Sequence, residues 1–264
     1  MIPVLAIGWD VGGWLGTKQG VAVLLHEGPG RAKFLSAPRR VRAAEIEARG
    51  LDGFLGGALG ASTGDVCERF RVVLAIDAPL GFPRAFGELL AGRPPKDPNP
   101  SREIDSTLAH RSCDRWVYEK HGKKPLSASF DKLGNNATVA MVVTGRLRAE
   151  RAFRALPFDA PQPGCPELIE VYPALVKRDG HALAPLARWL PREIEPGTDE
   201  HDAAICAVLG LAHACAGAEP DLPELVPPPA DLLEDARDEG WIYSPAPEWI
   251  ARAASTRRGR PRRR

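Results

Sequence analysis

Two apolar segments of this chain each end on an aspartate, Val4–Asp10 with the sequence VLAIGWD and Val72–Asp77 with the sequence VVLAID. A buried strand of four to six apolar residues cannot easily hold a charge within it, so each aspartate marks the place where a strand reaches the end of its sheet. A third apolar segment carries Glu170, and a predicted helix carries Asp202. Carboxylates from several strand ends and one helix are the oxygen ligands that Mg²⁺ and Mn²⁺ prefer. The sequence therefore predicts a divalent-metal site built from Asp10, Asp77, Glu170 and Asp202.

The length of 264 residues allows one large domain with an insertion, and 44% hydrophobic with 26% charged residues is ordinary for a globular protein. The net charge of +1 gives no general sign of nucleic-acid binding. The charges are nevertheless unevenly placed, because arginines crowd the last eight positions and the remaining chain is net acidic. The Arg-rich tail 257–264 cannot build a core, and we expect it to be disordered.

The five cysteines form no C-x-x-C pair, which argues against a disulfide framework or a thiolate zinc site. The first residues lack the basic region of a signal peptide, and no apolar run reaches the roughly 18 residues of a membrane span. We therefore expect a cytoplasmic protein with no membrane partner.

The apolar pattern predicts a mixed sheet flanked by helices. Strands are expected at Val4–Asp10, Gly20–His26, Ala32–Arg39, Val72–Ile76 and Leu168–Tyr172, and helices over about 43–59, 101–120, 137–156 and 199–216. This order predicts an α/β fold with an RNase H-like mixed five-stranded sheet, made of a three-strand antiparallel meander and two parallel strands. In such a sheet the first and fourth strands are neighbours, which would bring Asp10 and Asp77 together.

Three regions are expected along the chain. Residues 1–220 would form the RNase H-like domain, with a helical insertion at about 84–160 over the site. Residues 221–256 would form a C-terminal extension, entered through Pro227–Pro229, and the tail follows.

Each candidate ligand also has a simpler interpretation. Asp10 could be a turn residue before Gly12 and Gly13, Asp77 could end its strand before Pro79, and Glu170 could face a basic helix. Asp199 lies one helical turn before Asp202 and suits a helix start, which leaves Asp202 as the stronger ligand candidate. Single basic residues such as Lys177 could touch phosphate, although they more often pair with carboxylates.

Five short motifs resemble the predicted RNase H-like nucleases of domain of unknown function 429. They are DVGG at 10–13, IDAPLG at 76–81, RSCD at 111–114, EVYP at 170–173 and HDA at 201–203. The resemblance spans about residues 4–216. It implies an RNase H-like fold and a metal-supported acidic site, and it adds Arg111 and Asp114 as neighbours of that site.

Together the residues and the resemblance predict a nuclease that hydrolyses phosphodiester bonds of DNA or RNA with Mg²⁺ or Mn²⁺, by a two-metal type of mechanism. Two other classes stay open. Residues 10–17 faintly resemble the first phosphate loop of the actin and sugar-kinase superfamily of ATP-binding proteins, although no second loop of that kind is present. A non-catalytic binding module, with its carboxylates held in salt bridges, is the third class.

Overall fold

The computed structural model describes residues 2–15, 19–59, 63–95, 100–131 and 133–255. The expected disorder of the tail 257–264 concerns residues outside this described part of the chain. The strands of the main sheet are β1 (Val4–Asp10), β2 (Gln19–His26), β3 (Ala32–Phe34), β4 (Arg39–Val41), β5 (Arg71–Asp77), β6 (Arg154–Ala155) and β7 (Glu167–Glu170). Two small two-stranded sheets pair β8 (Lys177–Arg178) with β9 (His181–Ala182) and β10 (Leu225–Val226) with β11 (Ser244–Pro245).

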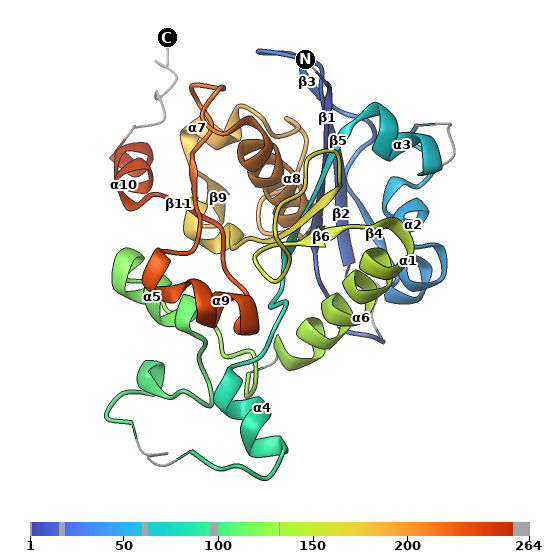
Figure 1. Ribbon diagram of the computed structural model, residues 1–264. Coiled ribbons are helices and arrows are strands. Elements are labelled where there is room, and N and C mark those ends of the chain that lie inside the picture. Colours follow the sequence, from blue (N-terminus) through green and yellow to red (C-terminus); the bar gives the residue numbers. More distant parts are fainter. Residues whose placement is uncertain (1, 16–18, 60–62, 96–99, 132, 256–264) are drawn as a thin grey trace.

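The main sheet is mixed, as the sequence predicts, and helices flank it (Figure 1). Its order is β3-β2-β1-β5-β7-β6, with β4 also on β2. Strand β2 is antiparallel to β1, β3 and β4, whereas β5, β6 and β7 are parallel to the neighbours that they pair with. The expected pairing of the first and fourth predicted strands is confirmed, because β1 pairs with β5 in parallel.

Helices line both faces of the sheet. They are α1 (Ala43–Arg49), α2 (Leu51–Leu55), α3 (Thr63–Arg69), α4 (Arg84–Leu90), α5 (Ser112–His121), α6 (Leu133–Arg151), α7 (Ala184–Ala187), α8 (Asp199–Cys215), α9 (Leu233–Glu239) and α10 (Pro247–Ser255), with short 3₁₀ turns η1 (Glu103–Asp105), η2 (Pro173–Val176) and η3 (Ala230–Leu232). One face of the sheet packs under α8, and the other packs under α1, α2 and α6. Helix α6 lies within the range 84–160 that is expected to be an insertion, and it covers one face of the sheet core.

Several predicted elements were wrong in extent. The predicted strand Ala32–Arg39 is two strands, β3 and β4, separated around Pro38, which lacks the N–H that a ladder needs. The main sheet accordingly has seven strands in the described residues instead of five. The predicted helix over 43–59 breaks at Gly50, whose positive φ of 54° is a conformation that glycine adopts readily.

The helix predicted over 101–120 begins only at Ser112, and the helix predicted over 137–156 runs from Leu133 to Arg151. After α6 the chain pairs with the sheet as β6. The predicted helix 199–216 agrees with α8, where the Thr198 hydroxyl accepts a hydrogen bond from the His201 amide as an N-cap.

Helix α8 lies unusually close to the sheet. A Cβ on Gly8 would clash with the backbone of Ala203 and Ala207, and one on Gly20 would clash with the backbone of Asp199. These two glycines let the helix backbone rest directly on β1 and β2. The position of α8 relative to the ends of those strands is thus set by backbone contact.

The segment after residue 220 packs into the same body. Tyr243 donates its amide to the Glu170 carbonyl at 2.9 Å, and Ile242 forms a parallel bridge to Glu170. The Glu239 carboxylate accepts the amides of Arg84 at 2.8 Å and Ser112 at 2.7 Å. The end of α9 therefore holds together two segments that lie far from it in the sequence.

Candidate functional site

Asp10 and Asp77 are the last residues of the parallel strands β1 and β5, and they face each other in the pairing register. Burial, with the nearby charges of Asp77 and Asp202, raises the pKa of Asp10 to about 8. Burial and the Asp202 charge likewise raise the pKa of Asp77 to about 7. Within the described residues no hydrogen bond reaches either carboxylate. The two side chains form an acidic pair, and no cationic side chain of the described residues makes an ion pair with either of them.

Asp202 comes to the same end of the sheet from the first turn of α8. Burial alone would raise its pKa, but hydrogen bonds from His201 and Lys177 outweigh burial, so the pKa of Asp202 is lowered. The His201 Nδ1 lies 3.4 Å from Asp202 Oδ1. Asp202 is therefore the member of the group that carries a negative charge most readily.

Lys177 supplies the cation of this group. Its Nζ lies 2.7 and 2.6 Å from the two oxygens of Asp202. The Lys177 charge also lowers the pKa values of Asp10 and Asp77 in part, although both values stay raised overall. The simpler interpretation of Lys177, pairing with a carboxylate, is the one that its geometry supports.

Glu170 lies beside the acidic pair, but its carboxylate is already engaged. Arg111 donates to it twice, at 2.6 and 2.8 Å, and the Leu80 amide donates at 3.1 Å. Arg111 also donates hydrogen bonds to Asp114 from Nε at 3.1 Å and from Nη2 at 3.0 Å. The side chains of Glu170, Arg111 and Asp114 are all buried. The structure therefore brings Glu170, Arg111 and Asp114 together as a separate ion network next to the site.

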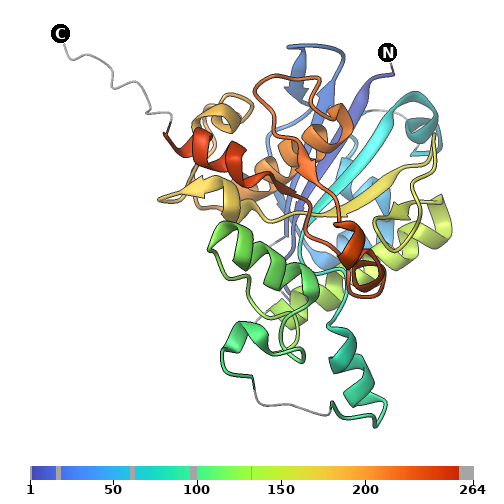
Figure 2. The same ribbon diagram turned by 60° about the vertical axis from the view of Figure 1, so that its left-hand side comes forward.

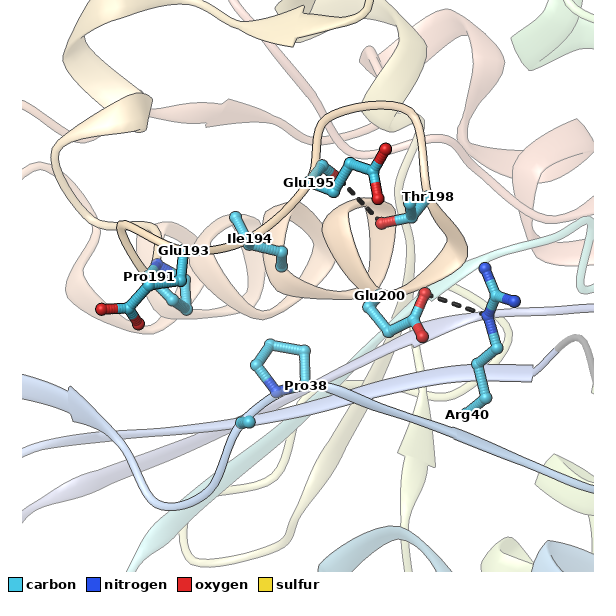
Figure 3. Close-up of a pocket in the computed structure, with 9 residues that line it drawn as sticks. Pro38, Arg40, Pro191, Glu193, Ile194, Glu195, Thr198 and Glu200 are labelled. Carbon is cyan, nitrogen blue, oxygen red and sulfur yellow. Dashed lines mark hydrogen bonds and ion pairs between the residues drawn. The ribbon is translucent and has the colours of Figure 1, made fainter.

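Asp199 pairs with an arginine outside this group of carboxylates. Its Oδ2 lies 3.3 Å from Nε of Arg40, which also donates to Glu200 at 3.0 Å. Figure 3 shows Arg40 of β4 next to Glu200, which lies in the first turn of α8. The pocket beside them has Glu193 and Glu195 in its wall. Asp199 contributes negative charge near Asp10, yet its partner is Arg40.

A cavity of about 170 Å³ opens between the acidic pair and the ion network. The residues along its wall include Asp10, Asp77, Glu170, Arg111, Asp114, Asn136, Tyr172 and Leu126. Burial, together with Asp77 and Asp114, raises the pKa of Tyr172 to about 12, so its hydroxyl is a hydrogen-bond donor at neutral pH. Tyr172 and Asn136 were missed as site residues, although Tyr172 stands within the EVYP motif.

The donor set fits a divalent cation only in part. Asp10 and Asp77 offer two adjacent carboxylates with raised pKa values, which a cation would relieve. Asp202 would complete the set by sharing its oxygens between that cation and Lys177. In the described part of the chain, however, no three His, Cys, Asp or Glu side chains already stand in a metal-binding arrangement.

Comparisons of the chain with protein-family models, with curated proteins and with solved structures found no match. Among the described residues, no helix has the length and apolar character needed to cross a membrane.

Proposed function

We propose that this protein is an RNase H-like nuclease, a metal-dependent hydrolase of phosphodiester bonds in nucleic acid. The observation that carries the proposal is the pairing of Asp10 with Asp77 at the ends of two parallel strands, where both carboxyl groups have raised pKa values. Two buried carboxylates held side by side are costly without a positive charge between them. A Mg²⁺ or Mn²⁺ ion would supply that charge.

The strand order supports the RNase H-like part of the proposal. An antiparallel meander of β3, β2 and β1 continues into the parallel strands β5 and β7, with α8 across one face. This is the sheet that the motifs at 10–13, 76–81 and 170–173 would imply. The proposal places its ligands at the carboxyl ends of β1 and β5, where open α/β sheets bind their ligands.

Each residue of the site would have a separate role. Asp10 and Asp77 would hold the cation, with Asp202 beside them. When bound, the cation would lower the pKa of a water molecule and polarise a phosphoryl oxygen. Lys177 and the Tyr172 hydroxyl would donate hydrogen bonds to phosphate oxygens at the rim of the cavity. Arg111 would act through Glu170, whose carboxylate holds the Leu80 amide and so fixes the loop after Asp77.

Calorimetric titration with Mn²⁺ tests the proposal, together with a panel of labelled single-stranded, duplex, hybrid and branched substrates. Wild-type protein should bind Mn²⁺ and cut at least one substrate, whereas Asp77→Asn should lose both activities. Asp105→Asn is the matched control, since Asp105 pairs with Arg102 away from the cavity. Intact substrates throughout, or cleavage by Asp77→Asn at the wild-type rate, would contradict the proposal. Stabilisation by ATP in that case would favour the kinase-like class.

A further inference from the structure

We propose that the substrate reaches this site as an unpaired strand whose base stacks on an aromatic shelf, which we define as Phe82, Phe86 and Phe130. The proposal rests on the nuclease function above and adds the strandedness of its substrate. Four observations carry it: the size of the cavity, the exposure of the shelf, the contacts that fix the shelf, and a lysine at the rim.

The cavity is too small for a nucleotide and its neighbours. Its volume of about 170 Å³ lies below the roughly 300–1,000 Å³ of sites that enclose drug-sized ligands. It can accept the reacting phosphate group, so the flanking sugars and bases must lie on the surface around its mouth. The chemistry of that surface therefore selects the substrate.

The surface next to the cavity is apolar and exposed. Leu126 lines the cavity and is 51% exposed, and Phe130, four residues later, is 62% exposed. The Phe130 ring meets the Phe86 ring edge-on at 5.8 Å, and Phe86 lies 5.8 Å from Phe82. Helix α4, which carries Phe86, stands out from the body beyond the site end of β5 (Figures 1 and 2).

The loop that carries Phe130 is held in place by local hydrogen bonds. The Ser127 hydroxyl donates to the Ala109 carbonyl at 2.7 Å and accepts the amides of Ser129 and Phe130 at 3.2 and 3.0 Å. Asp131 in turn accepts the Ser127 amide at 2.6 Å. Because the backbone that carries Phe130 is fixed in this way and its ring contacts Phe86 edge-on, little ordering is needed when a base stacks on the ring.

A second lysine adds positive charge at the rim. Lys123 donates to the Ala174 carbonyl at 2.7 Å, in the turn that leads to Lys177. No carboxylate of the described residues pairs with Lys123. A nucleic-acid strand would place a phosphate against this lysine and a base against the shelf. This pairing of chemistries favours a nucleic-acid strand over a second copy of the chain.

Fluorescence anisotropy with a labelled mixed-sequence single strand and its duplex, in buffer containing a chelator, tests the inference without any cleavage. Phe130→Ala should weaken single-strand binding roughly 5- to 150-fold, the range for losing one stacked base, while Phe130→Trp should retain it. Lys123→Gln should weaken binding and reduce the log–log salt slope by about 0.7. Ile2→Ala, which removes an equally exposed apolar side chain at the other end of β1, should change nothing.

Unchanged single-strand binding by Phe130→Ala would overturn the inference, as would equal losses for the single strand and the duplex. A wild-type dimer in sedimentation that Phe130→Ala converts to a monomer would also overturn it, since a second copy would then cover the shelf. Asp77→Asn separates the two proposals: it should bind the single strand as wild type does. Cleavage of duplex alone would refute the inference and leave the nuclease function standing. Single-strand binding without Mn²⁺ binding or cleavage would refute the nuclease function and leave the stacking of a single strand on the shelf standing.

Discussion

Two groups of carboxylates, one buried and one partly buried, meet at one end of this sheet, and their contacts with cationic side chains differ. In the first, Arg111 holds Asp114 and Glu170 with four side-chain hydrogen bonds of 2.6–3.1 Å. In the second, Lys177 makes its hydrogen bonds within the described residues to Asp202, and its charge only partly lowers the pKa values of Asp10 and Asp77. Both carboxylates of the first group therefore accept hydrogen bonds from a cation, whereas Asp10 and Asp77 of the second accept none from the described residues.

The difference indicates different roles. A planar guanidinium matches two carboxylates at once, so the Arg111 network fixes the positions of three chain segments. A carboxylate pair with raised pKa values is instead typical of a site that awaits a proton or a metal ion.

Removing the arginine of the first group should have the largest effect. Arg111→Met leaves Glu170 and Asp114 buried without their cation, and we expect the free energy of unfolding to fall by about 3–5 kcal/mol. Urea unfolding measures the change. The control is Arg102→Met, which breaks a pair of the same i,i+3 spacing in solvent and should leave stability almost unchanged. Similar losses in both variants would show that burial does not distinguish the two pairs.

Glu170→Gln should also destabilise the protein, by about 1.5–3 kcal/mol, because it weakens charged hydrogen bonds to Arg111. Its Mn²⁺ affinity should stay at the wild-type value, since Glu170 belongs to the network. Calorimetric titration checks the affinity. A large loss of Mn²⁺ binding would instead assign Glu170 to the metal site, as the sequence alone predicts.

Asp10→Asn should instead raise the free energy of unfolding of the metal-free protein. The pKa of Asp10 is about 8 in the folded state against 3.8 for the ordinary group, so the native state binds more protons between these values. Wild-type stability should therefore fall as the pH rises from about 4 to about 8. The neutral amide avoids this loss, and we expect Asp10→Asn to be more stable by about 1–3 kcal/mol at pH 8.

Urea unfolding in chelator at pH 5, 6.5 and 8 measures this difference. The stability of the variant relative to wild type should grow with pH across the series. A difference that stays constant or shrinks would mean that Asp10 is ionised without strain.

Lys177→Met should give the smallest change. It removes the cation of Asp202 at a site where the two side chains are 18% and 20% exposed, and we expect a loss of about 1 kcal/mol in chelator. Mn²⁺ should then raise the melting temperature of the variant more than that of wild type, because the ion would no longer share Asp202 with the lysine. An equal Mn²⁺ shift in both proteins would show that Lys177 and the metal do not compete.

The sequence predicts the centre of the site better than its surroundings. Strand ends are local features, and the parallel pairing of β1 with β5 is enough to bring Asp10 beside Asp77. The partner of Glu170 is 59 residues away in the sequence, so no local pattern could show that Arg111 engages it. The approach of Lys177 to Asp202 depends on how η2 packs against α8, which is again a tertiary contact. The resemblance supplied Arg111 and Asp114 as neighbours, but it did not supply their role.

The fold was likewise predicted better in its overall pattern than in the extent of its elements. Apolar runs predicted the strand order, and the prediction that Asp199 suits a helix start agrees with the first residue of α8. The break of the third strand near Pro38 and the break of the first helix at Gly50 came from single residues within otherwise regular patterns. Such interruptions change the extent of elements and leave the topology of the sheet intact.

The Glu239 contacts have a consequence for synthesis of the chain on the ribosome. The carboxylate that joins the amides of Arg84 and Ser112, and the carbonyl that receives Arg111, are made long after the strands that carry Asp10 and Asp77. Domains generally fold as units, so a domain that needs its C-terminal segment cannot be completed until that segment has left the ribosome. The wall of the cavity would therefore be incomplete while the chain is being translated, and a nascent chain near messenger RNA would not yet carry a finished site.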